Sequence, residues 1–358
     1  MYLRKILLAT LLLAGSPKLL ADVFYNDCCS PCYDECCGPC FDYAFWFDPM
    51  AVKPCQMDIV FAEIANSDII DTENIITVVT NRSFDPDWCF GFRVGGGIRP
   101  QCSPWSFRAD YSYWQNSTRF GFFIPSPEGV QTTIDTVGFH FRSLINQATD
   151  IDVKAHLDYD YHLLDVTAGW SCCICNGLEF TPYGGFRGLW YTTDARMDGS
   201  ALTDEDNFEN QKVKIKNDYH AYGVVGGVRF DYRLWNCMNF YGSFGGSIVA
   251  GDNDLKLVNL VTLVDNGEII TGLVTRRETR CHYIHSLEGK WGVTYDMCLC
   301  GFDTHLGLGY EVTQWSTVLP NTRGNLALGA DESFGADLDS NGQGLFIHAI
   351  TARIGVAF

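Results

Sequence analysis

The chain has 358 residues and a formal net charge of −18, from 43 acidic and 25 basic side chains. This excess of negative charge argues against nucleic-acid binding, which needs a basic surface. Thirty-five glycines and an aromatic fraction of 14% favour strands and turns over helices, and sixteen cysteines indicate an oxidising compartment.

The first residues have the pattern of a secretory signal peptide, which we assign to 1–21. Arg4 and Lys5 provide the positive start, residues 6–14 the apolar centre, and Ala21 the cleavage point. The apolar run is too short for a membrane-spanning helix, and no later segment offers eighteen consecutive apolar residues. We therefore expect an exported chain that is soluble, periplasmic, or an outer-membrane barrel.

Residues 22–40 form a cysteine-rich segment that we place in the periplasm. Six cysteines fall within thirteen positions, including the two CxxC units at 29–32 and 37–40. Thioredoxin-type redox chemistry would need a βαβ context, which this segment lacks, and only four residues separate the units, which is tight for zinc. Disulfide bonds are therefore preferred over a metal site or redox catalysis.

Alternation of apolar and polar residues, which is typical of strands with two different faces, begins at Phe41 and recurs along the chain. At Leu163 and Leu164 the alternation changes phase, which suggests a β-bulge. Apolar runs at 59–64, 75–79 and 137–141 could add strands, the first two as a hairpin above the membrane. The main strands predicted from the alternation are 41–48, 90–99, 105–113, 156–170, 178–192, 219–233, 238–250, 280–295, 300–315 and 345–358.

The connections between these ten strands alternate between long and short, with long loops expected at 193–217 and 251–279. Bacterial outer-membrane barrels have an even strand number, short periplasmic turns and long outer loops. A soluble sandwich would instead show a turn about every eight to twelve residues. The sequence thus predicts an all-β fold: an antiparallel transmembrane barrel over 41–358, with about ten and at most twelve strands.

The last strand supports a closed barrel. Its alternate residues Ile350, Ile354, Val356 and Phe358 are apolar and are expected to face outward, with small or polar residues between them. Pairing this strand to the first one leaves no open edge in lipid. We expect these four residues to close the barrel and to be needed for its assembly.

Several segments, in a fixed order, resemble one known family. They are FRVG at 92–95, WSFRADYSY at 105–113, LLDVTAG at 163–169, TPYGGFRGLW at 181–190 and GLGYEVTQW at 307–315. The chain over 41–358 is similar to the pore-forming major outer membrane proteins of the Legionella type, which have relatives in environmental chlamydiae. The resemblance implies a porin. The cysteine-rich start departs from the plain porin pattern and looks like the disulfide-crosslinked envelopes of chlamydial relatives.

Charged residues of both signs fall on the predicted inward face. Charges in a lumen need partners or water, so they indicate either a hydrated channel or a filled barrel held by ion pairs. The family resemblance favours the channel, with passive diffusion of small hydrophilic solutes or ions. The proposed pore-lining residues are Arg93, Arg108, Asp110, Arg187, Arg229, Glu288, Lys290, Glu311 and Arg353. The residues expected to share that face are Asp158, Asp160, His162, Asp231, Asp303 and His305.

Two other functions stay open: a structural envelope protein or adhesin with a plugged barrel, and an outer-membrane hydrolase. The hydrolase is less favoured, because Asp and His pairs at 158–162 and 303–305 have a common spacing and no GxSxG element is present. We expect no catalytic residues, no cofactor and no metal. Residues 337–342 begin like a calcium loop, but His348 stands where a bidentate Glu belongs.

The expected topology collects most cysteines at the periplasmic side. Neighbours only three residues apart would close very small, strained loops, so exchange with other proteins is favoured. The thirteen cysteines concerned are Cys28, Cys29, Cys32, Cys36, Cys37, Cys40, Cys102, Cys172, Cys173, Cys175, Cys237, Cys298 and Cys300. Cys55, Cys89 and Cys281 lie near the outer ends, where Cys55 could pair with Cys89.

The partners that we expect follow from this topology. They are outer-membrane lipid, the barrel assembly machinery, and other cysteine-rich envelope proteins or further copies of this chain, joined through disulfides. The chain is expected in the bacterial outer membrane, and association of barrels with one another is left open.

Overall fold

The computed structural model of the chain describes residues 41–357 with internal gaps. Those gaps are 57–59, 72–73, 84–85, 101–102, 126–130, 137–138, 142–149, 176, 205–206, 236, 266–267, 300–301 and 324–336. In parts of several strands toward the long loops, only the backbone is described. The assigned signal peptide and the cysteine-rich segment lie outside the described residues.

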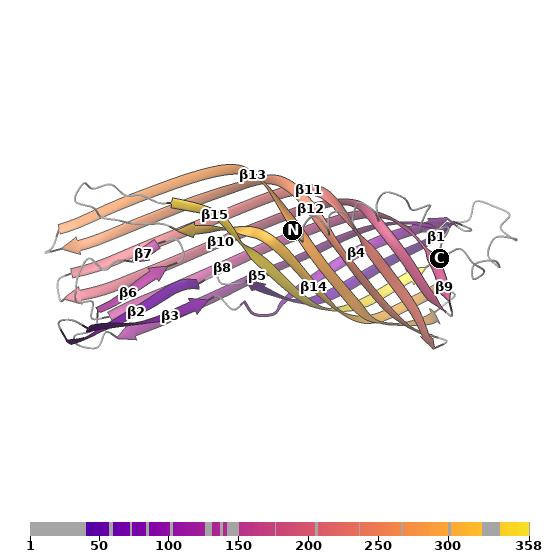
Figure 1. Cartoon of the computed structure of the whole chain (residues 1–358), viewed down its shortest axis with the longest axis horizontal. Helices are drawn as coiled ribbons and strands as arrows, with labels where there is room; N and C mark the ends of the chain where they lie inside the picture. The colour runs from indigo at the N-terminus through magenta and orange to yellow at the C-terminus, as the bar shows by residue number, and fades with distance from the viewer. Residues whose placement is uncertain are drawn as a thin grey trace.

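Ten long antiparallel strands form a closed barrel (Figure 1). Each strand pairs with its neighbours in chain order, and the ring closes where β15 pairs with β1. The barrel strands are β1 (Phe41–Gln56), β4 (Cys89–Pro100), β5 (Trp105–Pro125), β8 (Asp150–Trp170), β10 (Leu178–Asp204), β11 (Asn207–Trp235), β12 (Met238–Asp265), β13 (Glu268–Leu299), β14 (Phe302–Arg323) and β15 (Asp337–Ala357). The predicted ten-stranded barrel is confirmed. A short strand, β9 (Cys172–Cys175), pairs with the start of β10.

A separate four-stranded sheet lies at the long-loop end, opposite the end that holds β9 (Figure 1). It contains β2 (Val60–Asp71), β3 (Asn74–Ser83), β6 (Gln131–Thr136) and β7 (Phe139–Phe141), in the order β3-β2-β6-β7. The antiparallel pair β2–β3 is the hairpin predicted from the two apolar runs. Because these strands form their own sheet, the barrel keeps ten strands.

Two predicted long loops are instead extensions of strands. The β10–β11 pairing continues to Asp204 and Asn207, and the β12–β13 pairing continues to Asp265 and Glu268. The prediction of loops at 193–217 and 251–279 was therefore wrong. Dense charge obscured a period-2 pattern on β11, where charged residues such as those at 212, 214 and 216 face outward and apolar or neutral ones face inward.

The outer surface next to the short turns is an apolar belt. Aromatic and aliphatic side chains are exposed there on every barrel strand, as expected for a surface in contact with lipid. Tyr–His pairs mark its outer edge: the Tyr111 hydroxyl lies 2.6 Å from His162 Nδ1, and the Tyr310 hydroxyl lies 2.7 Å from His348 Nδ1. Such amphipathic rings are typical of the membrane interface. In bacterial outer-membrane barrels the short turns face the periplasm, and we adopt that orientation.

The polarity of the two faces inverts on several strands where they leave the belt. On β8 the inward residue changes from Leu163 to Asp165, while the outward residue changes from His162 to Leu164. Pairing with β5 and β10 is continuous through this point. The predicted β-bulge is thus absent: the change of phase in the sequence marks the edge of the membrane.

The same inversion corrects one part of the predicted inward face. Asp158, Asp160 and His162 lie on the outer surface beyond the belt, because the buried, inward positions of β8 are the odd-numbered ones. His162 Nε2 lies 3.2 Å from Asp160. These residues were placed inside because polar residues are expected in a lumen, which holds only within the membrane zone. No helix among the described residues is long and apolar enough to span a membrane.

Candidate functional site

The barrel interior contains a layer of buried ion pairs, which we call the ion-pair layer. It joins four cations and four acids, so its formal charges balance. Its members are Asp48, Arg93, Asp165, Arg187, Glu288, Lys290, Glu311 and Arg353. They come from seven of the ten strands, each at an inward position.

One group of this layer is centred on Arg93 of β4. Its guanidinium donates two hydrogen bonds, of 2.6 and 2.7 Å, to the carboxylate of Glu311 on β14. Strands β1 and β15 lie between these two, so the contact crosses the interior of the ring. Arg353 donates to both oxygens of Asp48 at 2.9 and 2.7 Å, and Lys290 Nζ lies 3.5 Å from Glu311. Bidentate pairs of this kind fix both partners in orientation.

The other group is centred on Arg187 of β10, whose side chain is 1% exposed. It donates to both carboxylate oxygens of Asp165 at 2.6 Å and also to Glu288. Its Nη1 further donates to the hydroxyls of Ser247 and Ser286, each at 3.2 Å. This group has one cation and two acids, whereas the Arg93 group has three cations and two acids, so the charges balance over the layer as a whole, as burial of ions requires.

A glycine makes room for the polar side chains just below this layer. Trp46 Nε1 donates to Asp110 Oδ1 at 2.8 Å, and the indole lies over Gly95 of the neighbouring strand. A Cβ at that position would overlap the indole, so any larger residue there would displace Trp46.

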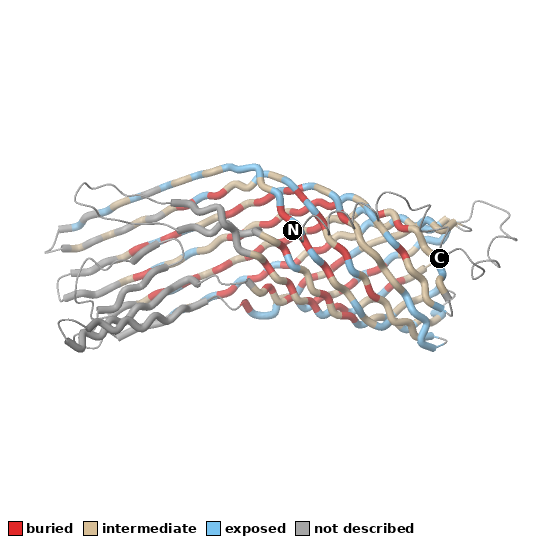
Figure 2. Tube along the Cα trace, viewed as in Figure 1, coloured by how far each residue is buried: buried red, intermediate tan, exposed pale blue. Residues whose placement is uncertain are grey.

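Toward the long loops, the interior is closed by a second layer, which is apolar. Figure 2 shows buried residues along the strands between the long-loop end and the short-turn end. Nine strands contribute buried side chains to it, and Cys89 of the tenth, β4, packs against it. We call it the apolar layer; it contains Met50, Val52, Trp114, Val153, Ala155, Leu157, Tyr159, Tyr161, Leu163, Leu189, Tyr191, Tyr219, Ala221, Val249, Ile284, Trp315, Leu345, Ile347 and Ala349.

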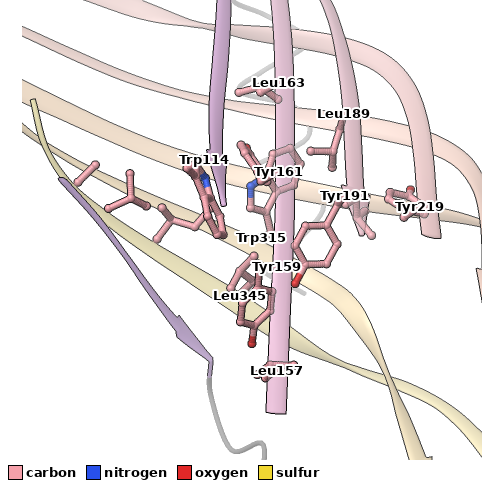
Figure 3. Close-up of a cluster of buried hydrophobic side chains, with 14 of the residues drawn as sticks. Trp114, Leu157, Tyr159, Tyr161, Leu163, Leu189, Tyr191, Tyr219, Trp315 and Leu345 are labelled. Atoms are coloured by element: carbon pink, nitrogen blue, oxygen red, sulfur yellow. The ribbon is translucent and has the colours of Figure 1, made fainter. Parts of the chain in front are cut away.

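Aromatic rings from opposite walls meet in the apolar layer (Figure 3). Trp315 of β14 and Tyr161 of β8 are separated by four strands in either direction around the ring. Trp114 stacks on Tyr161 with 5.1 Å between ring centroids, and Trp315 is fully buried. The two layers touch, since the Arg187 guanidinium lies 5.8 Å from the Trp315 ring. The lumen is therefore filled at this level.

The interior becomes accessible to water toward the short turns. Asp42, Arg99 and Asp231 are exposed there, and Arg99 lies 3.4 Å from Glu179. At the rim, His305 Nδ1 lies 2.7 Å from Asp296. All nine residues proposed from the sequence as pore-lining project into the interior, between this mouth and the apolar layer.

Charged pairs also form a collar on the outer surface beyond the belt. Arg277 donates to both oxygens of Asp254 at 2.9 and 2.5 Å, and these hydrogen bonds hold the pKa of Asp254 below its ordinary value. Burial raises the pKa of Asp194, but hydrogen bonds from Arg196 and Lys214 outweigh it and lower that pKa overall. These pairs keep the outer half of the barrel soluble.

The structure places four of the predicted periplasmic cysteines at the short-turn end: Cys172, Cys173, Cys237 and Cys298. The segment with Cys28, Cys29, Cys32, Cys36, Cys37 and Cys40, together with Cys102, Cys300 and the side chain of Cys175, lies outside the described residues.

The pairing of Cys55 with Cys89, which the sequence left open, is not formed in the structure. Val52 is the ladder partner of Cys89, so Cys55 is three positions away along β1. Cys89 packs inside against the apolar layer, whereas Cys55 occupies an outward position. The wall of the barrel thus separates the two side chains.

On β15, Ile350 and Ile354 are exposed on the outer surface, and Val356 occupies the same face. Phe358 lies outside the described residues. Among the described residues, no group of three or more His, Cys, Asp and Glu side chains could hold a metal ion. The side chains of 337–342 are not described.

A family model described as the Legionella pneumophila major outer membrane protein precursor matches residues 58–347. The chain belongs to this family. It is accordingly an outer-membrane protein, and the resemblance found in its sequence segments is confirmed. No curated protein sequence matches the chain.

Solved structures of other outer-membrane proteins are similar only at a low level. Outer membrane protease OmpT from Escherichia coli has 11% sequence identity and a TM-score of 0.37. The match covers 88% of this chain and 96% of the OmpT chain. The toluene transporter TodX from Pseudomonas putida has 7% sequence identity and a TM-score of 0.19. The match covers 88% of this chain and 89% of the TodX chain. No functional residue is transferred from either.

Reasoning from the sequence missed the apolar layer. The sequence does contain a pattern that indicates this layer. One face of β8 carries an unbroken row of large apolar residues: Leu157, Tyr159, Tyr161 and Leu163. Alternation alone predicts that this row faces lipid, whereas in the structure it faces the interior beyond the membrane zone.

Proposed function

We propose that the protein is a porin, an outer-membrane channel through which small hydrophilic solutes and ions diffuse passively. The ion-pair layer carries this proposal, because it puts four cations and four acids from seven strands inside the barrel. Charge in a lumen sets the local concentration of counter-ions and so tunes passage. Membership of a major outer membrane protein family supports the same function.

In this proposal the passage begins at the exposed periplasmic mouth and continues along the charged interior. The residues that would line it are Arg93, Arg108, Asp110, Arg187, Arg229, Glu288, Lys290, Glu311 and Arg353.

The apolar layer is the barrier that a solute has to pass. Narrow apolar constrictions exclude water and thereby block ions, and this layer is filled by side chains. Passage therefore requires Trp315 and Tyr161 to move apart, so we expect brief openings from a mostly closed state.

One observation favours a different function. All ten strands contribute to or touch the apolar layer, as in a small barrel whose interior serves as a core. In that case the protein is a structural component of the envelope and conducts nothing.

Single-channel recording of the refolded protein in planar bilayers separates the two functions. A porin gives defined conductance steps, and Trp315→Ala increases the fraction of time spent open. Trp291→Ala is the matched control, because Trp291 is 45% exposed on the lipid-facing surface. A silent wild type with a conducting Trp315→Ala variant would favour the structural barrel. Silence of both, with the proteins correctly folded, would overturn the porin proposal.

We also propose that disulfides link the barrel to cysteine-rich envelope proteins or to other copies of itself. Two exposed cysteines, Cys237 and Cys298, support this at the periplasmic end. Non-reducing electrophoresis of envelopes, with thiols trapped beforehand, should give high-mass species that reductant converts to monomer. Replacing all six cysteines of 28–40 with serine should remove most of these high-mass species, whereas Cys281→Ser should not. A monomer in unreduced envelopes would contradict the proposal.

A further inference from the structure

Two arginines inside the barrel differ from the rest. Arg93, Arg187 and Arg353 each form a bidentate pair with a carboxylate. Arg108 of β5 and Arg229 of β11 belong to none of the ion pairs within 4.0 Å among the described side chains. We call these two residues the arginine pair.

Aromatic rings, in place of acids, hold the arginine pair. The Arg108 guanidinium carbon lies 4.3 Å from the centroid of Trp46, and that of Arg229 lies 4.1 Å from the centroid of Tyr183. Stacking occupies one face of each guanidinium and leaves its N–H edge available. Arg108 Nε is buried and has no hydrogen-bond partner. An unsatisfied buried donor on a cation is costly, and a bound acceptor would remove that cost.

Thr167 of β8 is next to Arg108 in the strand ladder and accepts a hydrogen bond of 3.0 Å at its Oγ1 from Arg229 Nη2. The Arg229 and Arg353 guanidiniums are near enough to Arg108 to repel it electrostatically. The nearest acids are Asp110, which accepts from Trp46, and Asp231, which is exposed. Like charges held together in this way attract an anion.

A ligand can reach the arginine pair from one side only. Arg108 and Arg229 are partly exposed, and the mouth next to them is lined by exposed residues such as Asp42 and Asp231. Toward the long loops, the ion-pair layer and the apolar layer lie in the way. Access is therefore from the periplasm and does not require the barrel to conduct.

We propose that Arg108, Arg229 and Thr167 form a binding site for a small oxyanion, with inorganic phosphate as the simplest case. Two planar N–H edges match the tetrahedral arrangement of phosphate oxygens, and the threonine hydroxyl can donate to a third oxygen. In a chain with a net charge of −18, this site concentrates an anion at a place where the overall field would repel it.

The test is titration of the refolded full-length protein in detergent micelles with inorganic phosphate, in buffer free of other oxyanions, followed by calorimetry and phosphorus NMR. The wild type should bind saturably. Arg108→Gln and Arg229→Gln should each weaken binding about tenfold or more, the usual effect of losing one charge-assisted hydrogen bond. Arg99→Gln is the matched control, because Arg99 is at the same mouth but is paired with Glu179. It should bind phosphate as the wild type does.

Thr167→Val and Arg108→Lys keep the proposal testable if a glutamine variant does not fold, which heat-modifiable migration in electrophoresis would reveal. Both should weaken binding, the first by removing the hydroxyl and the second by removing the planar fork. The proposal is overturned if the wild type shows no saturable binding, or if Arg99→Gln loses as much affinity as the arginine-pair variants. Because binding is measured without a membrane potential, a silent bilayer recording would leave this result intact.

Discussion

Replacing Arg187 with methionine should destabilise the folded barrel by about 3–5 kcal/mol, the typical cost of leaving a buried charge without its partner. Arg187 is 1% exposed and holds both Asp165 and Glu288. Methionine has a similar length and fills the space, so little of the loss would come from a cavity. Because two carboxylates lose the same partner, we expect the upper part of the range.

A compensated variant tests the reasoning. Arg187→Met combined with Asp165→Asn and Glu288→Gln removes all three charges and leaves neutral groups that can hydrogen-bond Ser286. Its stability should return to within about 1–2 kcal/mol of the wild type. Urea unfolding in lipid vesicles, followed by tryptophan fluorescence, measures both variants.

The control for this prediction is Arg277→Met, which removes an ion pair from the exposed collar. It should leave the unfolding midpoint unchanged, because exposed pairs contribute little. A single Arg187→Met variant as stable as the wild type would refute our account of the ion-pair layer. A triple variant as unstable as the single one would show that packing, not uncompensated charge, sets the cost.

Three further predictions follow from the same structure. Arg353→Gln removes one lumenal cation while Asp48 keeps Arg93 at 3.6 Å, so reversal potentials should shift toward cation selectivity, and an unchanged potential would argue against Arg353 lining a passage. Deleting Phe358 should lower the amount of heat-modifiable barrel in the outer membrane, because the alternation of the sequence predicts that it continues the outward row of Ile350 and Ile354; normal insertion would contradict this. Arg277→Gln should raise the pKa of Asp254 toward its ordinary value, since hydrogen bonds from Arg277 lower it; carbon NMR of the carboxyl measures this, and an unchanged titration would contradict it.

The alternation of residues was sufficient to predict the barrel. Each strand near the short turns has one apolar and one polar face, as in β15 with Ile350 and Ile354 outside and Thr351 inside. The number of strands followed from counting the segments that show this alternation, because each strand of the exposed belt requires an apolar residue at every second position. The nine candidate lining residues were found in the same way.

The arrangement of the interior could not be predicted in this way. Arg93 and Glu311 are 218 residues apart, and their contact depends on how the whole ring closes. Local periodicity does not contain that information. Beyond the belt the rule linking polarity to direction reverses, so Asp160 and His162 were placed on the wrong face and Leu163–Leu164 was taken for a bulge.

The inversion of polarity along the strands also sets how deeply the barrel sits in its membrane. A shift of two residues along a strand, about 6–7 Å, would draw outward groups such as Asp160, Lys216 and Asp252 toward the hydrocarbon. The cost of a charge in the bilayer rises with depth, from about 0–1 kcal/mol near the interfaces to about 2–4 kcal/mol for Arg or Lys at the midplane, and is smaller for Asp. A shift the other way would expose the apolar belt to water. A change of insertion depth is thus opposed in both directions.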